Sequence, residues 1–120
     1  MANAKEISDI ISQATGTTQY YKFSQIPQFP VITDGVKSVV ELAGCYWLLD
    51  VIGFKQIDPK LDKAFQVWKL EVDTENTRGV LRGFNDTTLI ITQDVPFTTF
   101  PLAELKLFLI DGVLLLPSEY

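Results

Sequence analysis

The chain has 120 residues, one cysteine, no histidine and a net charge of −5. This length fits one domain, residues 1–120, with a sizeable core, and the lack of histidine excludes Ser/His/Asp and Cys/His catalysis and histidine metal sites. The negative charge argues against binding to nucleic acid or to an anionic membrane. Because residues 1–10 alternate charged and apolar side chains without a signal segment, we expect a cytoplasmic protein.

Short elements precede the main helix. Residues 5–13 place three isoleucines on one side of a helix that must dock to be stable. Residues 14–18 contain TGTT, which lacks the glycine spacing and the lysine of a P-loop, so we expect a turn that ends the helix. The following QYYKF is either a short strand or an extended segment. Residues 24–33, with two prolines, predict an irregular crossing.

Residues 34–56 predict the longest helix and the centre of the fold, because apolar residues recur there at spacings of three, four and seven. Asp34 is the expected N-cap. Residues 42–54 are apolar almost all round, so we expect neighbours on more than one side; these 13 residues are fewer than the roughly 20 that span a bilayer. Gly44 lowers helix propensity by about 1 kcal/mol relative to alanine, and we interpret it as a notch where another backbone approaches.

The second half of the chain predicts strands. Residues 64–72 alternate between two faces, as a half-buried strand does. Residues 78–84 and 89–95 are separated by the turns DTEN and NDTT, and they complete an antiparallel meander.

The sequence LKLFLIDGVLLL predicts a hairpin around Asp111 and Gly112. Its core face is expected to carry five leucines: Leu105, Leu107, Leu109, Leu114 and Leu116. The other face is also apolar, with Phe108, Ile110, Val113 and Leu115. It therefore needs the N-terminal helix or another subunit over it, and we predict a homodimer through this face. The alternative is a helix over residues 101–110, which contain good helix formers.

Asp50 is the only charged residue in the apolar part of the main helix. A carboxylate in such a setting needs a partner, and Tyr46, one turn earlier, is the first choice. Asp50 is then either a satisfied structural carboxylate or a general acid or base with a perturbed pKa. Cys45 lies in the same apolar run and is expected to be a buried, inert thiol.

Arg78 and Arg82 point the same way from the second strand of the meander. They either bind a phosphate or carboxylate, or cover Trp68 and pair with acidic neighbours. The acidic residues 71–75 lack the glycine and the terminal glutamate of a calcium loop. We therefore expect a solvated hairpin tip, no metal site and no cofactor.

These elements predict an α+β fold: an antiparallel sheet of about five strands, mostly C-terminal, packed on one long central helix with a short N-terminal helix beside it. Six segments in order, TGTTQYY, TDGV, AGCYWLLD, FQVWKL, FPLAELKL and LPSEY, resemble a family of small bacterial proteins of unknown function that occur with mobile elements. The likeness spans about residues 15–120. It implies no known activity, cofactor or catalytic residue.

Two functional hypotheses follow. The first is a non-enzymatic cytosolic interaction protein, which by family association modulates a host or mobile-element protein. The second is a small-ligand-binding protein or a carboxylate-based enzyme, with a pocket between helix and sheet. Its candidate residues are Asp50, Tyr46, Trp68, Arg78 and Arg82. Catalysis stays open at this point, with the non-enzymatic hypothesis favoured.

Overall fold

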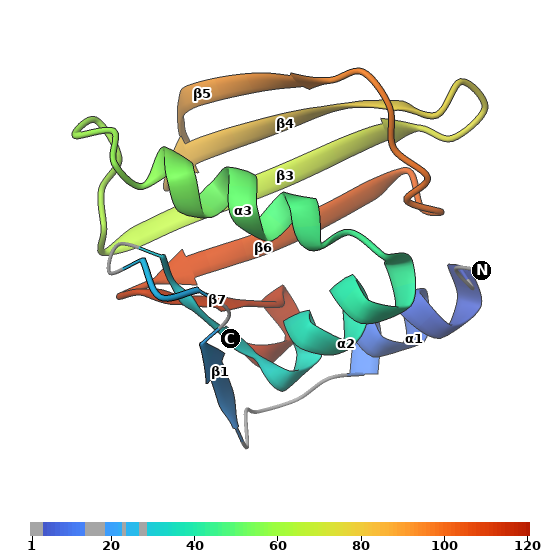
Figure 1. The fold of residues 1–120 in the computed structure, drawn as a ribbon, viewed down its shortest axis with the longest axis horizontal. Helices are drawn as coiled ribbons and strands as arrows, with labels where there is room; N and C mark the ends of the chain where they lie inside the picture. The colour runs from blue at the N-terminus through green and yellow to red at the C-terminus, as the bar shows by residue number, and fades with distance from the viewer. Residues whose placement is uncertain (1–3, 14–18, 23, 27–28) are drawn as a thin grey trace.

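The computed structural model describes residues 4–13, 19–22, 24–26 and 29–120, so the turn predicted at residues 14–18 lies outside the described residues. Helices pack against a seven-stranded mixed sheet (Figure 1). In chain order the elements are α1 (Ala4–Gln13), β1 (Tyr20–Lys22), β2 (Val31–Thr33), α2 (Asp34–Ala43), α3 (Tyr46–Lys55), β3 (Phe65–Asp73), β4 (Arg78–Asn85), β5 (Thr88–Val95), β6 (Glu104–Ile110), β7 (Val113–Leu115) and the 3₁₀ helix η1 (Pro117–Glu119). The α+β class is confirmed.

The strand order is β1-β2-β7-β6-β3-β4-β5. The meander β3-β4-β5 and the hairpin β6-β7 are antiparallel, as predicted, and the alternative helix over residues 101–110 is wrong. Asp111 and Gly112 have φ values of 48° and 84°, which the type I′ turn requires. The five-stranded antiparallel sheet is also wrong, because β1 and β2 extend the sheet and β2 pairs with β7 in parallel. Each of these two strands has three residues, too few to show an alternating pattern.

The long central helix is wrong as well, because α2 ends at Ala43 and α3 begins at Tyr46. Between them Gly44 has a φ of 64°, and the N–H groups of Gly44 and Cys45 both donate to the carbonyl oxygen of Val40. A Cβ at Gly44 would meet nothing within 4 Å, so the notch interpretation is wrong. Glycine occupies this position because a left-handed residue ends the helix.

The start of α2 also differs from the prediction. The N-cap is Thr33, not Asp34. The Thr33 hydroxyl oxygen accepts a hydrogen bond from the Val36 N–H at 3.2 Å. A side-chain oxygen one residue earlier than expected therefore satisfies a free donor of the first turn.

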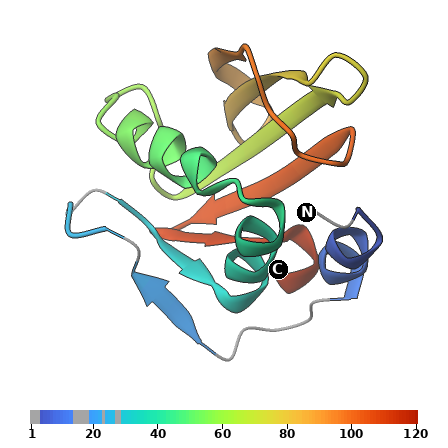
Figure 2. The same cartoon turned by 45° about the vertical axis from the view of Figure 1, so that its right-hand side comes forward.

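The core lies between the sheet and the two helices α2 and α3, which cross one face of the sheet (Figures 1 and 2). Buried side chains of α3 include Leu48, Leu49 and Ile52. The five hairpin leucines predicted for the core are all buried, at 2% exposure or less. Among the described residues, no helix is long and apolar enough to cross a membrane.

The opposite face of the sheet, which we call the open face, carries half-buried or exposed side chains. On the three central strands this face is formed by Phe65, Val67, Lys69 and Glu71 of β3, Arg82 and Phe84 of β4, and Lys106, Phe108 and Ile110 of β6. Because side chains alternate along a strand, the same strands that build the core display these groups.

Candidate functional site

Trp68 and Arg82 lie on opposite faces of the sheet. Trp68 is 1% exposed and belongs to the core, whereas Arg82 pairs in register with Lys69 on the open face. The prediction that Arg78 and Arg82 cover Trp68 is therefore wrong. Gly83, which is the residue opposite Trp68, leaves the space that the indole ring fills.

Asp50 and Tyr46 lie on the side of α3 that faces away from the sheet. Tyr46 is 46% exposed and Asp50 is exposed. The described residues provide no hydrogen-bond or ion-pair partner for Asp50, so the prediction of a partly buried, paired carboxylate is wrong. The five predicted ligand residues thus occupy three separate places and do not line one pocket between helix and sheet.

A buried amide network joins the end of α3 to β3. The Gln56 side-chain N–H donates to Gln66 at 2.9 Å, and the Gln66 side-chain N–H donates back at 2.8 Å. The Trp68 indole N–H donates to Gln66 at 2.9 Å, and Lys63 donates to the Gln56 backbone carbonyl oxygen. Since these buried amides have partners, the network is a structural tie. The sequence analysis did not predict this network. A glutamine at a core position of β3 was the feature that could have indicated it.

Cys45 is 1% exposed, and this burial raises the pKa of its thiol to about 11. The thiol is therefore protonated near neutral pH and is not a nucleophile there. Among the described residues, no group of three or more Cys, Asp or Glu side chains is placed to hold a metal ion.

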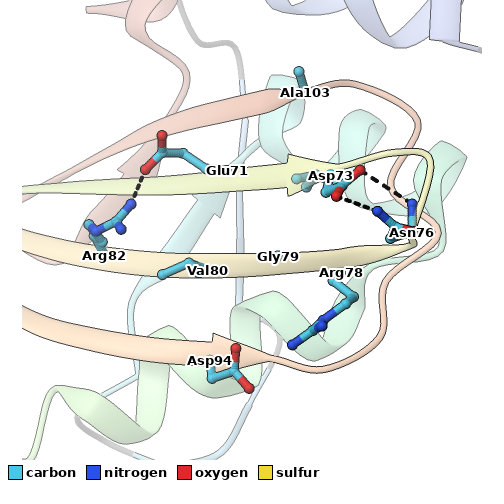
Figure 3. A pocket seen from close by; sticks show the side chains of 10 residues that line it. Glu71, Asp73, Asn76, Arg78, Gly79, Val80, Arg82, Asp94 and Ala103 are labelled. Carbon is cyan, nitrogen blue, oxygen red and sulfur yellow. Dashed lines mark hydrogen bonds and ion pairs between the residues drawn. The ribbon is translucent and has the colours of Figure 1, made fainter.

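A charged hollow of about 560 Å³ lies at the β3–β4 end of the open face (Figure 3). Glu71 and Arg82 form an ion pair across it. Asp73 accepts hydrogen bonds from the Asn76 side chain at 2.7 Å and backbone at 3.3 Å, and these bonds lower the pKa of Asp73. Arg78 lines the same hollow. Much of the charge of the residues that line this hollow is therefore compensated by other residues within it.

An apolar hollow of about 420 Å³ lies beside it on the open face. Its walls are Phe65, Val67, Lys69, Phe84, Asp86, Thr87, Lys106 and Phe108. The rings of Phe65 and Phe108 meet edge to face, with centroids 5.5 Å apart. The Tyr120 ring packs on Phe108 at the same centroid distance, so the chain's own last residue covers part of the hairpin's second face.

The outer face of α3 is the third candidate surface; we define it by Tyr46, Asp50, Phe54 and the following Ile57. Phe54 is 55% and Ile57 is 65% exposed. A helix that is apolar all round is normally buried all round. In this molecule the sheet covers only one side of α3.

Hydrogen bonds of Glu119 connect the C-terminal residues to the start of α2. Its carboxylate accepts hydrogen bonds from the Thr33 hydroxyl at 2.7 Å and the Leu116 N–H at 3.0 Å. A Cβ at Gly35 would lie 2.7 Å from a carboxylate oxygen of Glu119. Glycine leaves room for the carboxylate at this position, and a carboxylate near a helix N-terminus is favourably placed. Two segments that the resemblance rests on, TDGV and LPSEY, meet at this contact.

Comparison with known proteins gives one match. No curated protein and no solved structure matches the chain. A model of a family of unknown function, DUF6876, matches residues 5–120. The chain therefore belongs to the family DUF6876.

Proposed function

We propose that this chain is a non-enzymatic interaction protein that binds another protein through the outer face of α3. The observation that carries the proposal is the exposure of Phe54 and Ile57 on a helix that the sheet covers on one side only. Aromatic residues such as Tyr46 and Phe54 are the typical anchors of protein interfaces. The resemblance to bacterial proteins that occur with mobile elements supports a cytosolic partner belonging to the host or to the element.

Asp50 specifies the chemistry of that partner. It lies between Tyr46 and Phe54 on the same side of the helix, one turn from each. Covering this face would remove water from an unpaired carboxylate, which is costly unless the partner supplies a cation. The partner surface is therefore apolar with one lysine or arginine opposite Asp50.

The test uses two synthetic helical peptides of equal length, one of leucine and lysine and one of leucine and glutamate. The readout is the pair of indole N–H signals in an NMR spectrum. Trp47 is half-buried on α3, whereas Trp68 is buried and bonded to Gln66. We expect the lysine peptide to shift the Trp47 signal, the glutamate peptide to have little effect, and Asp50→Lys to reverse this preference by about tenfold in affinity.

Asp9→Lys on α1 is the matched control, because it makes the same change in net charge at an exposed position elsewhere. It should leave the preference for the lysine peptide in place. If both variants change the preference equally, net charge explains the binding, and the outer face of α3 is not the docking surface.

We separately propose that two copies of the chain associate through the β6–β7 hairpin. Phe108, Ile110 and Val113 are only half-buried on the open face, even with Tyr120 packed against Phe108. We expect light scattering at micromolar concentration to give a dimer mass that Val113→Glu abolishes and Leu89→Glu, on β5, preserves. A monomer mass for the unchanged chain would rule out this interface.

A second candidate function, small-ligand binding, is favoured by the apolar hollow on the open face. Ligand sites typically occupy about 300–1,000 Å³ and are lined by aromatic side chains with a few polar groups. At about 420 Å³, with three phenylalanines and two lysines, this hollow falls within that range.

A further inference from the structure

Three cations form one row across the open face. Lys106 of β6 faces Lys69 of β3, and Lys69 faces Arg82 of β4. Like charges directly opposite each other on adjacent strands destabilise a sheet. The arrangement therefore calls for anions close by.

The neighbouring acidic residues compensate only part of this row. Glu104 lies 3.5 Å from the Lys69 ammonium, and Glu71 pairs with Arg82. Lys106 is exposed, and the described residues contain no ion-pair partner for it. One ammonium group of the row is thus left available.

Lys106 and Lys69 stand at the edge of the apolar hollow. Two residues further along each strand, on the same face, lie Val67, Phe84 and Phe108, which are paired in register across β3, β4 and β6. Asp86 and Thr87, in the turn after β4, also line the hollow. The negative charge of Asp86 disfavours a second anionic group on a ligand, while Thr87 and Asp86 can accept a hydrogen bond from a neutral one.

Resting on the small-ligand function stated above, we propose that this hollow binds a small molecule with one anionic group on a flat aromatic or linear aliphatic body. The anion lies between the ammonium groups of Lys106 and Lys69, and the apolar body lies on Val67, Phe84 and Phe108. The contact gives Lys106 a partner and removes part of the phenylalanine surface from water. This site is independent of α3, which packs on the opposite face of the sheet.

The experiment titrates three probes into the ¹⁵N-labelled chain: decanoate, the cation decyltrimethylammonium and acetate, which lacks an apolar body. We expect decanoate to shift the backbone signals of Val67, Phe84 and Phe108, and the other two probes to leave them unchanged. Lys106→Gln should weaken decanoate binding by about tenfold. Lys5→Gln on α1, with the same loss of charge, should not weaken it.

Four outcomes would overturn the proposal. Equal shifts with decyltrimethylammonium would show that the anion is not recognised. Decanoate shifts confined to α3 would place the binding on the other side of the molecule. An unchanged affinity of Lys106→Gln for decanoate would show that the Lys106 ammonium does not bind the anion. Light scattering is recorded on the same samples, because Phe108 also belongs to the proposed hairpin interface. A change in mass without shifts at Val67 and Phe84 would indicate binding at that interface and would count against the ligand site.

Discussion

The two faces of β3 handle polar groups in opposite ways. Towards the core, Gln66 exchanges hydrogen bonds with Gln56 and accepts one from the Trp68 indole. Towards solvent, Lys69 reaches Glu104 only at 3.5 Å. Buried polar atoms must find partners because they have lost water, whereas exposed ones keep water as an alternative. The covered face therefore fixes the fold, and the open face retains groups free to bind.

The largest effect is expected for Gln66→Ala. This change leaves the Trp68 indole N–H and the Gln56 amide buried without their partner, so the free energy of unfolding should fall by about 3 kcal/mol. Urea denaturation measures it. Val67→Ala, one residue along on the open face, is the control and should cost less than about 1.5 kcal/mol. Equal costs would contradict the difference between the two faces.

Gly83→Ala should come next. The new Cβ would lie 2.7 Å from the Trp68 ring, and that ring is held by its bond to Gln66. Overpacking of this kind costs about 1–3 kcal/mol in the free energy of unfolding. The same substitution in a Trp68→Phe background should cost less, because the smaller ring leaves room. An unchanged cost would mean that the indole does not set the space at Gly83.

Gly44→Ala should lower the free energy of unfolding by about 1–2 kcal/mol, because an L residue is strained at a φ of 64°. Thermal denaturation of Gly44→Ala and Gly44→Asn separates strain from packing. Asparagine tolerates the left-handed conformation better than alanine does, so it should cost less despite its size. If Gly44→Asn lost more stability than Gly44→Ala, a close packing neighbour at this position would explain the loss.

The smallest effect is expected for Arg82→Gln on the open face. Its ion pair with Glu71 joins side chains that are 35% and 46% exposed. Such pairs contribute less than about 1 kcal/mol, and the difference between the two proteins should shrink further in 1 M salt. A larger, salt-independent loss in urea denaturation would mean that the open face is as tightly coupled as the core.

The hairpin, the meander and the five core leucines were predictable because alternation of apolar residues with period two is a strong signal. The break in the helix was not recognised, since residues 42–54 remain apolar through Gly44 and Cys45. Glycine at a helix end and glycine at a close contact look the same in sequence; the φ value and the space around the Cβ position separate them in the structure.

The candidate site was harder to predict than the fold. Asp50 was expected to be buried because its helix is apolar all round, but composition does not say how many sides the sheet covers. The apolar hollow draws residues from three strands and a turn. Its assembly depends on the register that places Lys69 opposite Lys106. No tight turn joins β3 to β6 to fix that register, because β4 and β5 lie between them in the chain.

The contact of Glu119 with Thr33 joins residues 86 positions apart, and β2, which pairs with β1 on one edge, has β7 as its neighbour on the other. During synthesis, β1 and β2 leave the ribosome long before residues 113–119 exist. Until then, the edge of β2 that pairs with β7 has no partner in the nascent chain, and part of the apolar surface of α2 is uncovered. Such a chain is exposed to aggregation, or to capture by a chaperone, until residues 113–119 have left the ribosome.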